Sequence, residues 1–262
     1  MTVENLLRAV RQLYETVLGD QLIGCYLHGS LALGCFQWSR SDVDFLAVVR
    51  EEPAQAQKEA LIAGLLQLES DAPPKGFEMS LLCQDACKPF RYPTPYVLHY
   101  SRMHRARAMH DLAAYCQTMR GTDKDLAAHI AVLCQSGVVL CGKAIAEVFD
   151  PVPRSCYLDS VLEDIGPDAA LCHDPAYTLL NLCRTWAYLE SGRILSKRQG
   201  GEWALGRLSP DEAKGIRAVL AYYGGKEAVF PPAQELQACA AGLLARVRQR
   251  LPQGQTEEDT DT

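Results

Sequence analysis

The sequence predicts an α+β protein in two parts, a mixed sheet with helices followed by an all-helical part. Over residues 1–150, short apolar runs typical of strands alternate with apolar spacing typical of helices. The segment Asp150–Pro153 contains two prolines, which disfavour helix on both sides and indicate a linker. From there to about residue 251 every periodic segment is helical. We therefore expect domains at 1–150 and 151–251, and a disordered acidic tail at 252–262.

The first part is expected to contain four helices and four strands. Helical spacing indicates helices at 3–18, 54–68, 111–136 and 142–149. Alternating or continuously apolar runs indicate strands at 23–27, 43–49, 77–82 and 96–100. Between the first two strands, Gly29-Ser30 is expected to open a short helical turn that ends near Leu33.

The helices of the second part are predicted from the residues at their N-termini. Asp174-Pro175 precedes a long apolar helix to about Leu189. The pattern Ser-x-x-Gln at Ser196 is typical of a capping box, and Ser209-Pro-Asp-Glu is a second one. Pro231-Pro232 precedes the final helix, which is expected to end near Leu251.

Composition limits the function classes. The chain has 262 residues, 48% hydrophobic and 22% charged, which is typical of a globular protein with a substantial core. Its net charge of −6 argues against nucleic acid as the main partner, although a local basic pocket could hold a triphosphate. No apolar run approaches the roughly 20 residues of a membrane span, and the first residues lack the pattern of a secretory signal.

The cysteines indicate a reducing compartment. There are eleven, an odd number, and none forms a C-x-x-C pair. Most, including Cys25, Cys134, Cys141 and Cys183, have apolar neighbours, where cysteine behaves as a small hydrophobic residue. We expect structural thiols rather than a disulfide framework or a metal site, and a cytoplasmic protein.

The most informative motif is a Gly-Ser turn followed by two aspartates on a strand. Gly29-Ser30 precedes Asp42 and Asp44, which share one face of the predicted strand because side chains alternate. Two carboxylates on one rigid face suit a hard cation such as Mg²⁺, which brings phosphates with it. Gly29 allows close backbone approach to a phosphate, and Ser30 can add a hydroxyl hydrogen bond.

Glu78 on the next strand adds a third carboxylate. Together Asp42, Asp44 and Glu78 indicate a metal site built from two neighbouring strands. The alternative is that all three are exposed acids on a half-buried sheet face, since a bare D-x-D is weak by itself. The spacing from Gly29-Ser30 and the third acid favour the metal site.

These motifs resemble a known family. The pattern G-S-x10-S-D-V-D-F-L is similar to the signature of the nucleotidyltransferase superfamily that includes DNA polymerase β. Further segments, in order along both halves, resemble the streptomycin/spectinomycin adenylyltransferase family. They are Phe77–Met79, Arg91–Pro93, Leu98–Tyr100, Phe149–Pro153, Leu182–Trp186, Ser196-Lys197, Glu202–Leu205 and Tyr223-Gly224.

The resemblance implies a polymerase β-like domain followed by a helical domain, with ATP bound between them and Mg²⁺ as cofactor. Asp42 and Asp44 would hold the metal that bridges the phosphates. Glu78 matches the general base that takes a proton from a hydroxyl of an aminoglycoside or aminocyclitol antibiotic. AMP would then be transferred to that oxygen, giving antibiotic resistance.

The resemblance also implies a nucleotide site with residues from the helical half. Arg184 and Lys197 match triphosphate-binding cations, and Tyr223 matches a residue near the nucleotide. The alternative for the cations is surface charge on helices. Arg184 lies among apolar residues, where an unpaired cation would be costly, and this favours a phosphate partner. Trp186 and Trp203 are expected to be core residues.

The antibiotic side departs from the family pattern. Met103, Ile165 and Ala170 align with positions that are Trp, Trp and Asp in the family member active on both streptomycin and spectinomycin. Asp174 matches an interdomain Asp of the family, and a plain helix N-cap is an equally good interpretation. We therefore expect a drug site with Glu78, Met103 and Asp174, and spectinomycin rather than streptomycin as acceptor.

Two alternatives remain. The same domains could adenylylate another small molecule or a protein. The chain could also be a non-catalytic nucleotide-binding regulator, although an intact Asp42, Asp44 and Glu78 argue against it. We expect a monomer without nucleic-acid or membrane partners.

Overall fold

The computed structural model describes residues 2–166 and 174–251 and has the predicted α+β class. It divides into two compact units, residues 1–160 (unit 1) and 161–262 (unit 2). The division lies within helix α9 (Arg154–Ile165). The domain limits predicted from the sequence stay a prediction, and the predicted tail and Ala170 lie outside the described residues.

Unit 1 is built on a five-stranded mixed sheet. Its order is β5-β3-β2-β1-β7. Strands β2 and β3 are parallel, and the other neighbours are antiparallel. The strands are β1 (Leu22–Leu27), β2 (Val43–Val49), β3 (Phe77–Cys83), β5 (Leu98–Ser101) and β7 (Val138–Gly142).

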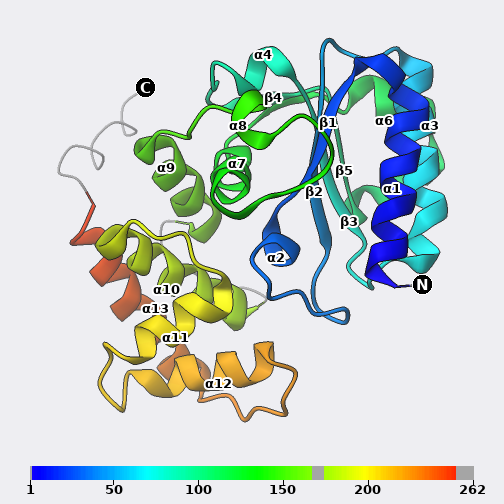
Figure 1. The fold of residues 1–262 in the computed structure, drawn as a ribbon. Helices are drawn as coiled ribbons and strands as arrows, with labels where there is room; N and C mark the ends of the chain where they lie inside the picture. The colour runs from blue at the N-terminus through cyan, green and yellow to red at the C-terminus, as the bar shows by residue number, and fades with distance from the viewer. Residues whose placement is uncertain (1, 167–173, 252–262) are drawn as a thin grey trace, which may run out of the picture. The chain divides into compact units, whose positions relative to one another are not determined.

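The two faces of this sheet are covered by different helices (Figure 1). On one face, α1 (Val3–Leu18), α3 (Gln55–Leu68) and α6 (Leu112–Thr118) bury Val43, Phe45 and Met79. On the other, α7 (Asp125–Ser136) and α8 (Ile145–Val148) bury Leu46, Val48 and Leu82. Strand alternation therefore sends Val43 and Phe45 to the first core and Asp44 toward the second face, as predicted.

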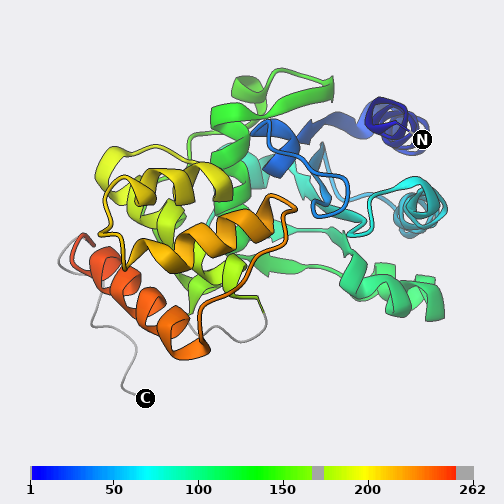
Figure 2. The same ribbon diagram turned by 90° about the horizontal axis from the view of Figure 1, so that it is seen from below.

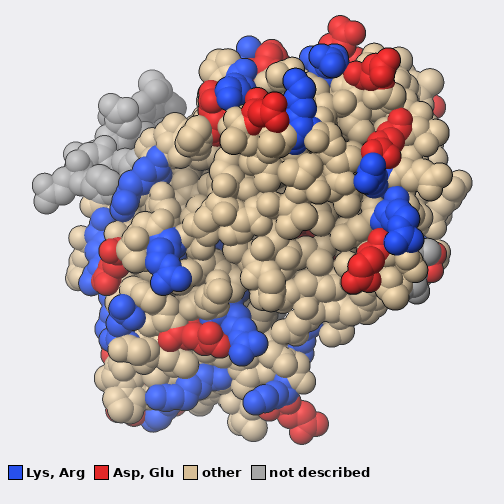
Figure 3. Space-filling model, viewed as in Figure 1, with Lys and Arg blue, Asp and Glu red and all other residues tan. Residues whose placement is uncertain are grey.

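Helix α1 shows how amphipathic spacing positions an element. Leu6, Val10 and Tyr14 are fully buried against the sheet. The outward side carries acidic and basic side chains next to one another (Figure 3), including the i,i+4 ion pair between Arg11 and Glu15 at 2.9 Å. Such an exposed pair contributes little to stability, so the helix is held by its buried stripe.

Two predicted helices were wrong in their limits. The predicted helix at 111–136 is interrupted by strand β6 (Gly121–Asp123), which pairs with β4 (Thr94–Tyr96). The predicted helix at 142–149 is only the four-residue α8, and the sequence did not predict the preceding strand β7. At 121–123, pairing with a distant strand overrides the local apolar spacing.

Short elements complete unit 1. They are α2 (Gly29–Ala32), α4 (Gln84–Cys87), α5 (Arg105–His110) and the 3-10 turns Gly19–Gln21, Glu69–Asp71 and Arg102–His104.

Unit 2 is helical, as predicted. Figure 2 shows α10 to α13, coloured yellow-green to red, packed against one another. They are α10 (Pro175–Ser191), α11 (Lys197–Leu205), α12 (Ala213–Tyr223) and α13 (Ala233–Arg248). Their core contains Leu179, Trp186, Ile216 and Leu243, with Trp186 and Trp203 in edge contact at 5.0 Å between ring centroids. Trp186 is a core residue, as expected, whereas Trp203 is only partly buried against this core.

Of the four cysteines named from the sequence, three are buried and one is exposed. Among residues 2–166 and 174–251, no cysteine is in a disulfide, and Cys25, Cys141 and Cys183 are buried. Cys134 is exposed, because it lies on the outward side of α7, so its apolar neighbours in sequence were misleading. No helix in the described residues has the length and apolar character needed to cross a membrane.

Candidate active site

The structure brings Asp42, Asp44 and Glu78 together. The parallel pairing of β2 and β3 places Asp44 directly beside Glu78, and Asp42 immediately precedes β2. Carboxylate oxygens of the three residues lie within 4.8 Å of one another. Two neighbouring strands thus present three acidic oxygens in one place, the arrangement that the sequence predicted.

The cluster concentrates negative charge. The Asp44 side chain is buried, and this burial, with the carboxylates of Asp42 and Glu78 next, raises its pKa to about 8. Mutual repulsion between closely placed carboxylates is relieved when a divalent cation binds them. The oxygen ligands present here are those that Mg²⁺ prefers.

Gly29 lies directly against this cluster. It has φ +58°, a left-handed conformation, and a Cβ built there would be 1.8 Å from Asp44 Oδ2. The amide of His28 donates to the carbonyl of Asp44 (3.1 Å), and the amide of Ser30 bonds the Asp44 carboxylate. Only glycine therefore allows α2 to pack this closely against Asp44. This reason holds apart from any close approach of the backbone to a phosphate.

Ser30 has a hydroxyl that fits a ligand. Its Oγ is buried, and the described residues offer it no hydrogen-bond partner. Buried hydroxyls are normally paired, so this oxygen is placed for an external group. Three carboxylates and an unpaired hydroxyl together fit a magnesium-bound phosphate.

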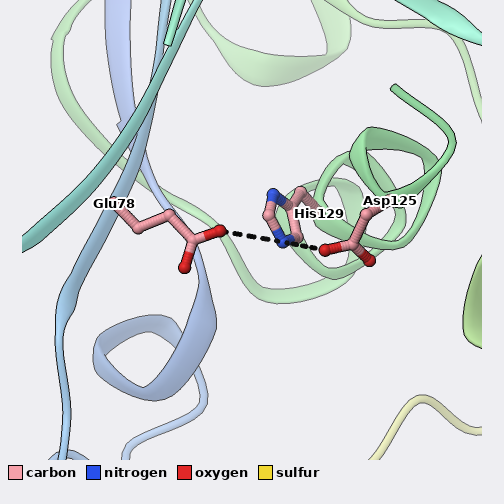
Figure 4. A group of neighbouring side chains, drawn as sticks. All are labelled: Glu78, Asp125 and His129. Carbon is pink, nitrogen blue, oxygen red and sulfur yellow. Dashed lines mark ion pairs between the residues drawn. The ribbon is translucent and has the colours of Figure 1, made fainter. Parts of the chain in front are cut away.

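The structure adds two residues to this site that the sequence motifs did not predict, Asp125 and His129. Figure 4 shows the His129 ring between the carboxylates of Glu78 and Asp125. Its Nε2 lies 3.1 Å from Asp125 Oδ2 and 3.8 Å from Glu78 Oε1. Burial lowers the pKa of His129, but Asp125, Glu78 and Asp44 outweigh it and raise this pKa to about 10.

His28 forms the other side of the His129 ring. The two ring centroids are 4.5 Å apart at an interplanar angle of 32°. Burial first, and the neighbouring His129 second, lower the pKa of His28 well below its usual value. His28 is thus a neutral packing partner.

A signal for the missed pair was present in the sequence. Asp125 and His129 are four residues apart in a segment predicted to be helical, so they share one helix face. What the sequence could not supply was the packing of α7 on the same sheet face as Glu78.

In unit 2, the predicted nucleotide-binding cations lie along one seam between α10 and α11. A Cβ built at Gly200 would be 2.8 Å from Arg184 Cα, so the two helices touch at this point. Lys197, at the start of α11, places Nζ 4.1 Å from the centroid of the Tyr177 ring of α10. Tyr223 ends α12 and is partly buried against the core of unit 2.

Arg184 has an unsatisfied atom. Its Nε is buried, and the described residues provide no hydrogen-bond partner for it. A buried guanidinium N–H normally binds an acceptor, so this atom also fits an external anion.

The predicted antibiotic-binding residues Met103 and Asp174 belong to different units. Asp174 Oδ1 accepts from the amides of Ala176 and Tyr177, so this residue is the N-cap of α10. Met103 is 83% exposed beyond β5, and Ile165 is buried in the core of unit 2. Their part in drug binding stays a prediction.

Comparisons with known proteins agree with the motifs. Residues 147–246 match the family described as aminoglycoside adenylyltransferase, C-terminal domain. An aminoglycoside (3'') (9) adenylyltransferase of Klebsiella pneumoniae is 28% identical over 247 residues, covering 90% of this chain and 91% of its own. A spectinomycin 9-adenylyltransferase of Staphylococcus aureus is 26% identical over 203 residues, covering 74% and 75%.

A solved structure shares the fold. The crystal structure of spectinomycin adenyltransferase AAD(9) from Enterococcus faecialis with ATP and spectinomycin aligns with a TM-score of 0.77. The alignment covers 94% of this chain and all of that one (100%) at 19% identity. The predicted resemblance to the streptomycin/spectinomycin adenylyltransferase family is thus confirmed, and the fold is that of these enzymes.

Proposed function

We propose that this chain, which is similar to aminoglycoside adenylyltransferases over most of its length, is an ATP-dependent O-adenylyltransferase of an aminocyclitol antibiotic. The observation that supports it most directly is the cluster of Asp42, Asp44 and Glu78 beside Gly29 and Ser30. Regulators that only bind nucleotide have no need of a third carboxylate placed as a base.

The three carboxylates have two roles in the proposed reaction, metal binding and proton transfer. Asp42, Asp44 and Glu78 would hold Mg²⁺, which would stabilise the charge that develops at the α-phosphate. Glu78 accepts the proton of the acceptor hydroxyl, because a neutral alcohol is a poor nucleophile. The oxygen then attacks the α-phosphate in line, and pyrophosphate leaves with the electron pair of the broken P–O bond.

Cations of unit 2 are assigned to the triphosphate. The buried, unsatisfied Nε of Arg184 supports this role, and Lys197 lies on the same helical seam. Tyr223 is assigned to the nucleotide with them. Phosphate oxygens are good partners for both cations, because each can donate several charged hydrogen bonds.

Spectinomycin is the acceptor that we favour over streptomycin. The support is the absence of the streptomycin-type residues at Met103 and Ile165, together with the relatives named for spectinomycin. A cationic aminocyclitol also suits the acidic side chains near Glu78. We propose Asp174 as a further residue that binds the drug. The absence of disulfides among the described residues supports a cytoplasmic enzyme, which we expect to act as a monomer.

The test is release of pyrophosphate from Mg-ATP with a panel of aminocyclitols. The wild-type protein should release pyrophosphate when spectinomycin is present. Glu78→Gln and Asp42→Asn should lose this activity but keep the far-ultraviolet circular dichroism spectrum of the folded protein. Nucleotide binding without turnover on any acceptor would indicate a regulator instead.

Resistance in a susceptible host tests the acceptor separately. Expression of wild type should raise the tolerated concentration of spectinomycin more than that of streptomycin. Resistance to streptomycin alone would refute the preference while leaving adenylyl transfer intact.

A further inference from the structure

We propose that His129, held by Asp125, is a positioning residue that orients the Glu78 carboxylate for proton transfer. The proposal rests on the proposed function, because the orientation matters only if Glu78 acts as a base. The observation behind it is the shared use of one atom, His129 Nε2, by two carboxylates from different elements (Figure 4).

The proton position follows from this geometry. A ring nitrogen that faces two carboxylate oxygens at 3.1 and 3.8 Å bears hydrogen, since an unprotonated nitrogen would repel both. The shorter distance belongs to Asp125, one turn earlier on α7. Asp125 therefore fixes the ring, and the longer contact to Glu78 Oε1 is one that can shorten when substrates bind.

The ring is held on several sides. His28 stacks on it from the end of β1, and α7 is anchored to the sheet by the buried Leu126 and Ile130. The His129 side chain is only 21% exposed. A donor on a packed helix is a more rigid reference point than one on a loop.

Glu78 needs such a reference point. Its long side chain can rotate away from Asp44, its direct neighbour in the parallel ladder, because the two carboxylates repel each other. A hold on Oε1 by His129 opposes that rotation.

The test compares two substitutions of His129. The amide nitrogen of Gln can occupy the position of Nε2, so His129→Gln keeps a donor, whereas His129→Leu fills the space without one. We expect kcat of His129→Leu to fall about 10- to 100-fold, the scale of a misplaced catalytic group. KM for ATP and for spectinomycin should stay near the wild-type values, and His129→Gln should recover most of kcat.

Other outcomes overturn the proposal. Equal losses in both variants, or a loss expressed in KM, would mean that the histidine supports the fold or binds substrate. Unchanged kcat in His129→Leu would mean that Glu78 needs no such hold. Thermal melting of each variant shows whether the fold persists.

A second measurement does not depend on turnover. In the full chain labelled with ¹⁵N-histidine, without nucleotide, the Nε2–H signal of His129 is identified by its loss in His129→Gln. It should shift in Asp125→Asn and in Glu78→Gln, and remain in place in Glu15→Gln, a control on α1. If the chemical shift of this signal does not change in Glu78→Gln, the proposed contact between His129 and Glu78 is wrong. An inactive wild type would instead count against the proposed function, and this shift would still decide the contact.

Discussion

At the scale of single residues, the Asp44 carboxylate lies so close to position 29 that only glycine fits there. The φ of Gly29 is +58°, and a Cβ built there would lie 1.8 Å from Asp44 Oδ2, so only a hydrogen fits at this position. Gly29→Ala should cost about 1–2 kcal/mol of stability for the left-handed backbone. It should also displace Asp44, so that magnesium-dependent pyrophosphate release is lost.

Gly34 provides the matched control. It has φ +66°, and a Cβ there would have no atom within 4 Å. Gly34→Ala should lower the melting temperature to a similar extent but keep activity. If Gly29→Ala also keeps activity, the close packing against Asp44 is not needed for catalysis.

His99 predicts a pH effect on stability. Its Nδ1 lies 2.9 Å from Ser80 Oγ, and burial, followed by His104 and His129, lowers its pKa from 6.5 to about 4. Because the unfolded chain then binds the proton more tightly, this contribution to stability is complete above pH 6.5 and is lost progressively as the pH falls toward 4.

The measurement is urea unfolding between about pH 7 and pH 5. His99→Asn keeps a polar group at the position of Nδ1 and cannot titrate, so it should lose less stability over this range than wild type does. His110→Gln, at an exposed position on α5, serves as the control. Parallel curves for wild type and His99→Asn would exclude His99 as a source of the acid sensitivity.

At the scale of elements, α11 depends on its capping box. Ser196 Oγ accepts from the amide of Gln199 (3.2 Å), and Gln199 Oε1 accepts from the amide of Ser196 (3.1 Å). Ser196→Ala should therefore cost about 1 kcal/mol, and Ser196→Gly only a few tenths. Denaturant unfolding, followed by circular dichroism, measures the loss of unfolding free energy in both variants. Equal losses would show that the protein needs the buried hydroxyl itself and that helix capping is not the cause.

The elements also show what the sequence could predict. Starts of helices with local chemistry, such as Ser196 and Asp174, were predicted correctly because a cap is a short-range interaction. Strand β7 was missed because its apolar run, Val138–Gly142, is too short for periodicity to distinguish strand from helix. Its pairing with β1 is a long-range contact.

The same distinction applies to the site. Asp42, Asp44 and Glu78 were found because a strand period places carboxylates on one face, and the structure brings them together. Asp125 and His129 were missed because only the packing of α7 on the sheet brings them to Glu78. Residues that join a site through tertiary packing have no local signature.

At the scale of the whole molecule, the proposed enzyme needs residues from both compact units. Arg184 is the sharpest test of unit 2, because its buried Nε has no partner among the described residues. Such a group destabilises the protein until an anion binds it. A charged hydrogen bond of about 1.5–3 kcal/mol corresponds to roughly 10- to 100-fold in affinity.

Arg184→Met should therefore raise KM for ATP by roughly 10- to 100-fold while leaving KM for the antibiotic little changed. Its melting temperature without ligand should equal or exceed that of wild type, because the unsatisfied donor is gone, and Mg-ATP should raise it less. Arg198→Met, on the exposed side of α11 where Arg198 pairs with Glu202 at 2.8 Å, should behave like wild type. An unchanged KM for ATP in Arg184→Met would remove Arg184 from the nucleotide site and leave unit 1 as the source of phosphate binding.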